Sequence, residues 1–385
     1  MEKIKLFFSA GEASGDLHAG ALMAALVRES ASRGAAVEFT YLGGDEMERA
    51  AGCPPVVHYR EMAFMGFADV LRNLGKVRRN LGAAIRAMER TRPDAVVLVD
   101  YPSFNLRLAR HAFSMGIPVY YFIAPKVWAW KKWRVRQLRR YCRKVLSILP
   151  FETDFFRSHG VEVEYVGNPS VAEVDERLLH TPERSGLCLR AGLAADTPYL
   201  LLAPGSRRSE IAKNLPVMLA AAAGAPQYPV IIAAAPGIEP EYYRTFTQAP
   251  MLAGETFALM ARAEAALVTS GTATLECALC GTPQVVCYRG GGSRMVYNIM
   301  KRILTIPYVS LPNLIVSDEI VPEMLMHLCT PDAVRRRLLD ILPGAPGRDA
   351  QLRGYAELRR RLTGSDAPAR AARAILDSLL RQLAE

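Results

Sequence analysis

Residues 267–289 are the part of the chain that most constrains its fold. They read LVTSGTATLECALCGTPQVVCYR: the end of an apolar run, a turn of small residues, a short helix, Gly281 as its stop and a second apolar strand through Tyr288. Two apolar strands joined through a helix predict half of a βαβ unit. We therefore expect an α/β fold.

The turn at Ser270, Gly271 and Thr272 opens the helix of this unit. A helix start presents unpaired backbone N–H groups and partial positive charge, so small residues there let an anion approach. Glu276 follows one turn later, where its carboxylate could accept hydrogen bonds from a ribose diol. An ordinary helix start followed by a solvated glutamate has the same residues, so this segment alone leaves both interpretations open.

Length and composition narrow the class of protein. A chain of 385 residues is expected to form two domains, and its mean hydropathy of +0.07 is that of a globular protein. No apolar run reaches the roughly 20 residues of a membrane-spanning helix, so we expect a cytoplasmic location. Seven scattered cysteines indicate reduced thiols. Cys277 and Cys280 form a CxxC without a second pair, and we expect neither a metal nor a cofactor.

The chain also begins with a strand, a glycine turn and a helix. The turn reads Gly11-Glu12-Ala13-Ser14-Gly15-Asp16, and its GxxxG spacing differs from the GxGxxG of dinucleotide-binding proteins. A nicotinamide enzyme is therefore disfavoured, and a doubly wound domain with a ligand at its strand ends is predicted. Further strands are expected at 37–42, 94–100, 119–123, 146–151, 199–203 and 230–235.

Asp100 ends the apolar run DAVVLVD and is followed by a break at 101–105, which includes Asn105. Ligands of open α/β sheets gather at the carboxyl ends of strands, so Asp100 is a candidate catalytic residue. An aspartate that caps the next helix is the alternative. In the second half, Arg207 follows a strand and the turn Pro204-Gly205-Ser206, where its guanidinium could bind a phosphate.

Positive charge is concentrated in one segment. Residues 126–144 hold nine lysines and arginines and no acid, against a formal net charge of +10 for the whole chain. Its start contains all three tryptophans, Trp128, Trp130 and Trp133, with Lys131 and Lys132 among them. This composition fits an anionic membrane surface or a single-stranded nucleic acid.

A second apolar cluster precedes a basic helix. Met62, Phe64, Met65 and Phe67 lie close together, with arginines and lysines at positions 72–86 behind them. These side chains could cover the sheet or insert into a bilayer. Together with the tryptophan segment they favour a membrane surface, and no RNA-binding signature accompanies them.

Six strings together resemble the lipid-A-disaccharide synthase family of GT-B glycosyltransferases. They are GEASGD at 11–16, PKVWAW at 125–130, LPFE at 149–152, LLAPGSR at 201–207, SGTATLE at 270–276 and YVSLPNL at 308–314. The resemblance implies two Rossmann-like domains of doubly wound parallel sheets that face each other across a cleft. We expect an acceptor and membrane domain at 1–168, a UDP-sugar domain at 169–345, and helices at 346–385 that pack on the first domain or on a partner subunit.

The resemblance also implies the reaction. A 2,3-diacylglucosamine would pass from its UDP-linked form to 2,3-diacylglucosamine 1-phosphate, with inversion, to give the β-1,6 disaccharide of lipid A and UDP. Such an enzyme is peripheral to the inner membrane of a Gram-negative cell, as a monomer or homodimer. Other GT-B enzymes of UDP-sugars, such as an epimerase or a transferase with a soluble acceptor, and a non-catalytic nucleotide sensor at the membrane remain alternatives.

The family's site residues are carried over by motif. UDP would be bound by Ser206, Arg207, Ser270, Gly271, Thr272, Glu276 and Asn313. The acceptor loop would comprise Gly11, Ser14, Gly15 and Asn105, with Asp100 or Glu12 as the general base. Asn168 stands where we expect a histidine, Lys126 where we expect a small polar residue, and Tyr101 and Ser103 alter the string after Asp100.

Overall fold

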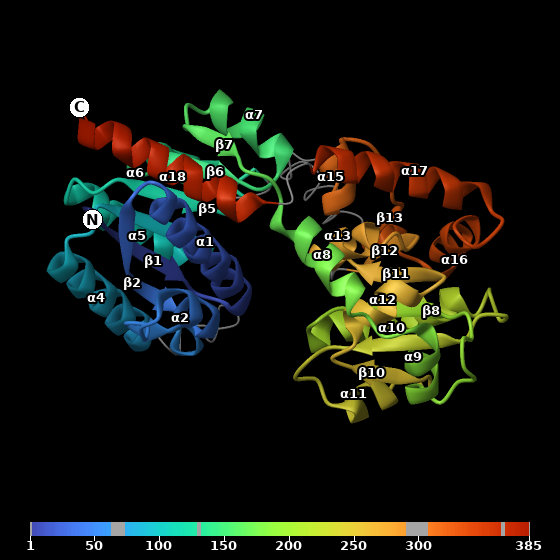
Figure 1. The fold of residues 1–385 in the computed structure, drawn as a ribbon. Helices are drawn as coiled ribbons and strands as arrows, with labels where there is room; N and C mark the ends of the chain where they lie inside the picture. The colour runs from blue at the N-terminus through green and yellow to red at the C-terminus, as the bar shows by residue number, and fades with distance from the viewer. Residues whose placement is uncertain (1, 63–73, 129–131, 290–306, 363–365, 385) are drawn as a thin grey trace. The chain divides into compact units, whose positions relative to one another are not determined.

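The computed structural model describes residues 2–62, 74–128, 132–289, 307–362 and 366–384. They form two compact units, one of residues 1–169 with 364–385 and one of residues 170–363 (Figure 1). Each unit is a parallel sheet between helices, so the α/β class and the two Rossmann-like sheets expected from the sequence are confirmed.

The first unit has a seven-stranded sheet in the order β3-β2-β1-β4-β5-β6-β7. All of its strand pairs are parallel. The strands are β1 (Glu2–Ala10), β2 (Ala35–Gly43), β3 (Val57–His58), β4 (Ala95–Val99), β5 (Val119–Phe122), β6 (Lys144–Ser147) and β7 (Val163–Tyr165). The order reverses between β1 and β4, which is where a doubly wound sheet binds its ligand.

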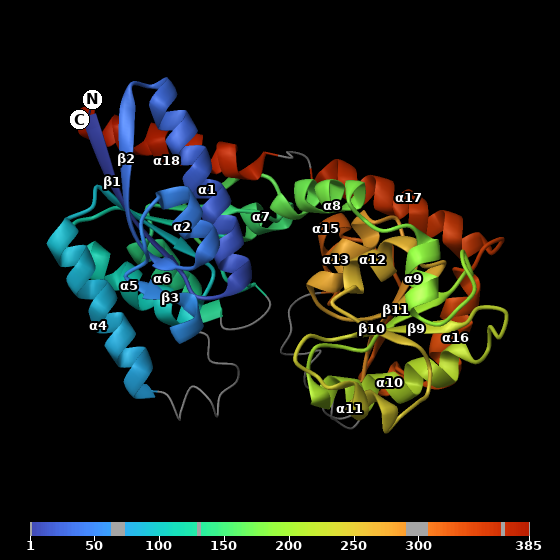
Figure 2. The same ribbon diagram turned by 60° about the horizontal axis from the view of Figure 1, so that its bottom comes forward.

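Helices cover both faces of this sheet (Figures 1 and 2). They are α1 (Ala13–Ser32), α2 (Asp45–Ala51), α4 (Leu74–Thr91), α5 (Pro102–Ser114), α6 (Val135–Tyr141), α7 (Pro150–Ser158) and α18 (Ala367–Ala384). Side chains alternate along β1: Leu6 and Phe8 pack with α1 and α18, and Phe7 packs with α4 and α5. Because both faces are buried at residues 6–8, this part of the strand is continuously apolar, whereas Lys3 and Lys5 before it are exposed.

The second unit repeats the plan with six parallel strands in the order β10-β9-β8-β11-β12-β13. They are β8 (Leu200–Ala203), β9 (Val230–Ala234), β10 (Met251–Ala253), β11 (Ala265–Thr269), β12 (Gln284–Tyr288) and β13 (Glu323–Leu325). Its helices are α8 (Pro169–Leu179), α9 (Arg184–Arg190), α10 (Arg208–Ala222), α11 (Pro240–Arg244), α12 (Thr256–Arg262), α13 (Thr272–Leu279), α15 (Leu311–Val316), α16 (Pro331–Asp340) and α17 (Pro346–Arg361). Its order reverses between β8 and β11.

Two segments differ from the expectation. The strand expected at 146–151 ends at Ser147, because Pro150 begins α7; proline suits the first helical turn, where its missing N–H is not needed. The C-terminal helices divide between the units: α17 packs in the second, and α18 packs on α1 in the first.

Candidate functional site

In the first unit, the two candidate carboxylates lie at the reversal of strand order. Gly11 and Glu12 follow β1, and Asp100 and Tyr101 follow β4. The pairing of Ala10 with Val99 brings these two strand ends side by side. The Asp100 charge acts on Glu12, so the two side chains lie within electrostatic reach of each other.

Desolvation raises the pKa of both carboxyl groups, although Glu12 is exposed and Asp100 is half-buried. The rise in the pKa of Asp100 is opposed by the Lys126 ammonium, by a hydrogen bond from the Tyr101 backbone N–H and by the charge of His18. Burial and then the Asp100 charge raise the pKa of Glu12. A carboxylate that is more basic than usual but lies beside a cation is suited to accept a proton.

The backbone after β4 has an unusual conformation. Asp100 and Tyr101 both adopt left-handed φ angles, of 44° and 46°, which cost energy in residues other than glycine. Hydrogen bonds hold the turn: the Tyr121 hydroxyl donates to the Asp100 carbonyl at 2.6 Å, and the Tyr101 hydroxyl donates to the Met62 carbonyl at 2.8 Å. A Cβ on Gly11 would overlap the Tyr101 ring.

The other residues expected in the acceptor loop have different positions. Asn105 is fully buried. Its Nδ2 donates to the carbonyls of Val99 and Asp100, and its Oδ1 accepts a hydrogen bond from the Ser9 hydroxyl. It therefore supports the turn from below. Ser14 is exposed in the first turn of α1, and Gly15 is buried against the end of β1.

Asp16 was not singled out from the sequence, although it ends the GEASGD string. It is 3% exposed, and its carboxylate accepts the backbone N–H groups of Gly44 at 2.6 Å and Glu46 at 3.0 Å. It thereby caps α2 from another helix. The sequence carries no local signal of this, because the donors lie about thirty residues further along the chain.

In the second unit, a pocket of about 340 Å³ opens at the reversal of strand order. It is lined from the turn after β8, from the end of β9, from the start of α12 and from the turn after β11. Ser206, Arg207, Ser270, Gly271 and Thr272 line it, so five residues expected to bind UDP lie around one space. Thr256 and Pro236 line it as well, and sequence reasoning had not included them.

Glu210 positions Ser206 and Arg207, two residues that line this pocket. Its carboxylate accepts from the Ser206 backbone N–H and from the Arg207 guanidinium, both at 3.1 Å. Gly205 has a φ of 122°, and a Cβ there would meet Glu210. The Arg207 side chain is 74% exposed, so a phosphate could reach its remaining donors.

Glu276 and Asn313 do not line this pocket. Glu276 lies further along α13, and its carboxylate is 3.7 Å from the Arg177 guanidinium; burial raises its pKa, opposed by Arg177. The Arg177 guanidinium also stacks 3.7 Å from the centroid of the Phe257 ring. Asn313 is fully buried, and its amide bonds to Glu323 and to the backbone of residues 320 and 321.

The residues expected at the membrane differ in their exposure to solvent. Met62 and Trp128 are buried, at 2% and 5% exposed, so these two do not form a membrane-facing surface. Trp133 is 58% exposed. Phe64, Met65, Phe67, Trp130 and Lys131 lie outside the described residues, as does the side chain of Lys132.

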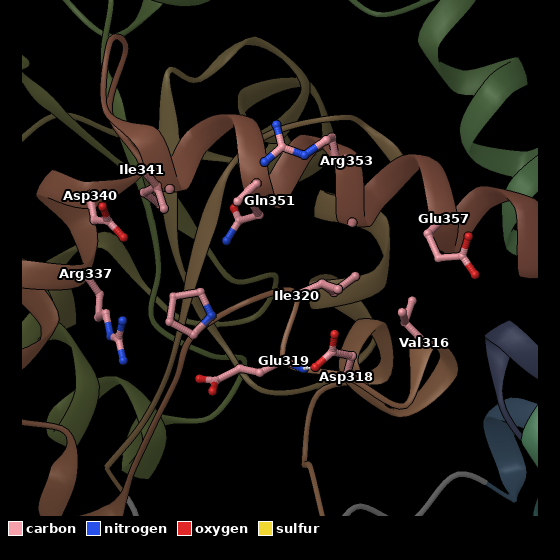
Figure 3. Close-up of a pocket in the computed structure, with 14 residues that line it drawn as sticks. Val316, Asp318, Glu319, Ile320, Arg337, Asp340, Ile341, Gln351, Arg353 and Glu357 are labelled. Atoms are coloured by element: carbon pink, nitrogen blue, oxygen red, sulfur yellow. Dashed lines mark hydrogen bonds between the residues drawn. The ribbon is translucent and has the colours of Figure 1, made fainter.

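A different pocket of about 590 Å³ lies in the second unit, among α15, α16 and α17 (Figure 3). Its charged lining residues are four acids and two arginines: Asp318, Glu319, Asp340, Glu357, Arg337 and Arg353. Its lining contains none of the expected site residues.

Two absences hold for the residues that the structure describes. Within these ranges no helix has the length and apolar character needed to cross a bilayer. Histidine, cysteine, aspartate and glutamate side chains nowhere gather in threes as metal ligands in this part of the chain.

Comparison with known proteins identifies the chain's relatives. Residues 6–352 match the family model described as lipid-A-disaccharide synthetase. The chain is 38% identical over 386 residues to the lipid-A-disaccharide synthase of Myxococcus xanthus, covering 97% of each chain. It is 34% identical to that of Koribacter versatilis over 390 residues, 98% of this chain and 100% of the relative.

Solved structures share the fold at much lower identity. A UDP-GlcNAc 2-epimerase of Neisseria meningitidis, bound to UDP-GlcNAc, aligns with a TM-score of 0.59 at 13% identity over 98% of this chain and 100% of its own. The calicheamicin glycosyltransferase aligns with a TM-score of 0.56 at 18% identity over the full length of both chains. These likenesses show the GT-B-like fold alone.

Proposed function

The chain belongs to the lipid-A-disaccharide synthase family, and from that premise we propose how its two units divide the reaction. The protein is a glycosyltransferase of lipid A biosynthesis. Its donor is UDP-linked 2,3-diacylglucosamine and its acceptor is 2,3-diacylglucosamine 1-phosphate. The donor's diphosphate binds in the second unit, and the acceptor hydroxyl is activated in the first.

The observation that carries the donor assignment is the pocket between the ends of β8 and β11. Two strand-to-helix turns meet there, and α13 begins at Thr272 with the small residue Gly271 before it. Its first backbone N–H groups and the Arg207 guanidinium supply the positive charge that a leaving diphosphate needs. The phosphate contacts the guanidinium donors of Arg207 that do not bond to Glu210.

Asp100 is the proposed general base. It follows β4 at the reversal of strand order, its pKa is raised by burial, and Lys126 and His18 favour its ionised form. The 6-hydroxyl of the acceptor gives its proton to the carboxylate as its oxygen attacks the anomeric carbon of the donor. The bond from that carbon to the phosphate oxygen breaks, its electrons leave with UDP, and the configuration inverts.

Product formation and UDP binding, measured separately, test this division. Asp100→Asn is expected to lower kcat by about 10²- to 10⁴-fold, the usual contribution of a general base, and to leave UDP affinity unchanged. Full turnover by folded Asp100→Asn would exclude Asp100 as the base. Glu12→Gln would then test the second carboxylate.

We also propose that the first unit binds the surface of the inner membrane, where both acylated substrates reside. A pocket of about 960 Å³ supports this, because Trp133, Arg136, Arg139 and His159 line it. The Arg134 guanidinium lies 5.5 Å from the centroid of the exposed Trp133 ring. Aromatic and cationic side chains together suit an anionic headgroup layer.

Cosedimentation with vesicles tests the membrane proposal. Charge reversal at Arg136 and Arg139 is expected to reduce binding to phosphatidylglycerol vesicles, whereas reversal at Arg353, in the second unit, is expected to leave it unchanged. Equal binding to vesicles of phosphatidylcholine alone would contradict an electrostatic surface.

A further inference from the structure

Glu152 is a buried carboxyl group that the proposed mechanism does not use. It lies in the first turn of α7 and is 1% exposed. The Trp128 indole N–H donates to its Oε1 at 2.8 Å, and the Ser147 hydroxyl donates to its Oε2 at 2.6 Å. The Trp128 ring also meets the Phe151 ring edge-on, with 4.9 Å between centroids. One carboxyl group therefore joins the end of β6, the start of α7 and the segment that follows β5.

The segment that follows β5 carries Lys126. The chain turns there through Ile123 at a left-handed φ of 57°, a conformation that β-branched residues rarely adopt. Pro125 and Val127, on either side of Lys126, are buried, whereas Lys126 itself is exposed. With both neighbours held in the core, the backbone at Lys126 is fixed in place, and its exposed side chain starts from that fixed point.

Lys126 lies within electrostatic reach of two carboxyl groups. Its charge lowers the pKa of Asp100 and the pKa of Glu152. On Asp100 its effect is larger than that of His18. The Glu152–Trp128 hydrogen bond holds this segment, so it influences where the charge of Lys126 lies relative to the proposed base, Asp100.

We propose that Glu152 is a positioning residue: its hydrogen bond to Trp128 fixes the segment after β5 so that Lys126 faces the carboxylate of Asp100. This rests on the proposed function, in which Asp100 takes the acceptor proton. The charged or titratable groups that act on Asp100 are Glu12 and His18 from the turn and helix after β1, Tyr121 from β5, and Lys126 from the segment after β5. Displacement of Lys126 removes the cation with the larger effect.

The burial of Glu152 supports a role beyond packing. Desolvation raises the pKa of this carboxyl to about 7, although the hydrogen bonds from Ser147 and Trp128 and the charge of Lys126 oppose the rise. Above this pKa the folded chain therefore holds a buried, ionised carboxylate. A neutral amide at this position would have a lower desolvation cost. Residues that lower stability in this way are typical of functional sites.

The pH dependence of kcat/KM tests the proposal. With detergent-dispersed substrates, the acid limb of the profile is measured for the wild type, Glu152→Leu, Glu152→Gln, Lys126→Met and the double variant Glu152→Leu/Lys126→Met. Loss of the nearby cation is expected to move the acid limb of Lys126→Met to higher pH, because the charge of Lys126 opposes the raised pKa of Asp100. Glu152→Leu is expected to move it in the same direction. The glutamine carbonyl still accepts the hydrogen bond from the Trp128 indole. The acid limb of Glu152→Gln should therefore stay at the wild-type pH.

The double variant separates positioning from a general structural defect. If Glu152 acts through Lys126, its loss in the Lys126→Met background produces no further movement of the limb. If Glu152→Leu does not fold, Trp128→Phe removes the same hydrogen bond from the other side. Glu162→Gln, on the surface of the same unit, serves as the matched control.

The positioning role of Glu152 and the role of Asp100 as base are contradicted by different results. An unmoved limb in Glu152→Leu or Trp128→Phe, a glutamine variant that behaves like leucine, or additive shifts in the double variant would each overturn the positioning role. Full activity of Asp100→Asn would instead overturn the proposed base, so the two failures are distinguishable.

Discussion

Replacement of Glu152 by glutamine is expected to stabilise the first unit in a pH-dependent manner. The side chain is buried, and its carboxyl has a pKa of about 7 in the folded chain, against an ordinary value of 4.5. Glutamine has nearly the same shape, accepts the Trp128 N–H through its carbonyl oxygen and does not titrate. The variant therefore removes the ionisation and keeps that hydrogen bond.

The sign and size follow from the two pKa values. Below pH 4.5 the carboxyl is protonated in both the folded and the unfolded chain, so it adds no pH-dependent cost. Between that pH and about 7 the unfolded chain loses the proton first, so the stability of the wild type falls as pH rises. A difference of about 2.5 units corresponds to about 3 kcal/mol. The advantage of Glu152→Gln should grow by up to that amount across this interval and then remain constant.

Urea unfolding followed by tryptophan fluorescence measures this difference. All three tryptophans lie at positions 128–133, so their fluorescence reports on the first unit alone. Unfolding free energies of the wild type, Glu152→Gln and the surface control Glu162→Gln are compared from pH 5 to 8.5. The control should stay within about 0.5 kcal/mol of the wild type. A difference between Glu152→Gln and the wild type that does not change with pH would refute the reasoning.

Three more predictions concern the candidate sites. Arg207→Ala should weaken UDP binding by about 10- to 100-fold in calorimetry, since hydrogen bonds to a charged group contribute about 1.5–3 kcal/mol; unchanged affinity would remove Arg207 from the UDP site. Gly11→Ala should lower the unfolding free energy of the first unit by about 1–3 kcal/mol, because its methyl group would overlap the Tyr101 ring; wild-type stability would mean that the ring moves aside at little cost. In a pH profile of kcat/KM, activity should fall with decreasing pH from above the ordinary aspartate range, because burial raises the pKa of Asp100; full activity down to pH 4 would contradict its role as base.

The sequence predicts the central strands and the turns between them, since these are local patterns. β1, β4, β8 and β11 are apolar runs followed by small or charged residues, so their ends were recognisable. The edge strands β3, β7, β10 and β13 have only two or three residues each. Strands this short have no measurable period and were not expected.

Contacts between distant segments could not be predicted in this way. Arg207 and Gly271 each follow a strand, and the family resemblance implied that both bind UDP; both line one pocket. The ion pair of Glu276 with Arg177 and the buried bonds of Asn313 depend on segments that no spacing rule brings together. The buried position of Glu152 was not predicted, because the apolar residues before it indicated a strand through residue 151. Pro150 is typical of a first helical turn and indicated the start of α7.

A structure of the protein with bound UDP tests the central claim most directly. We expect the diphosphate in the second unit, in contact with the Arg207 guanidinium and with backbone N–H groups at the start of α13. Density for the nucleotide beside Gly11 and Asp100 in the first unit would contradict the proposed division of the reaction.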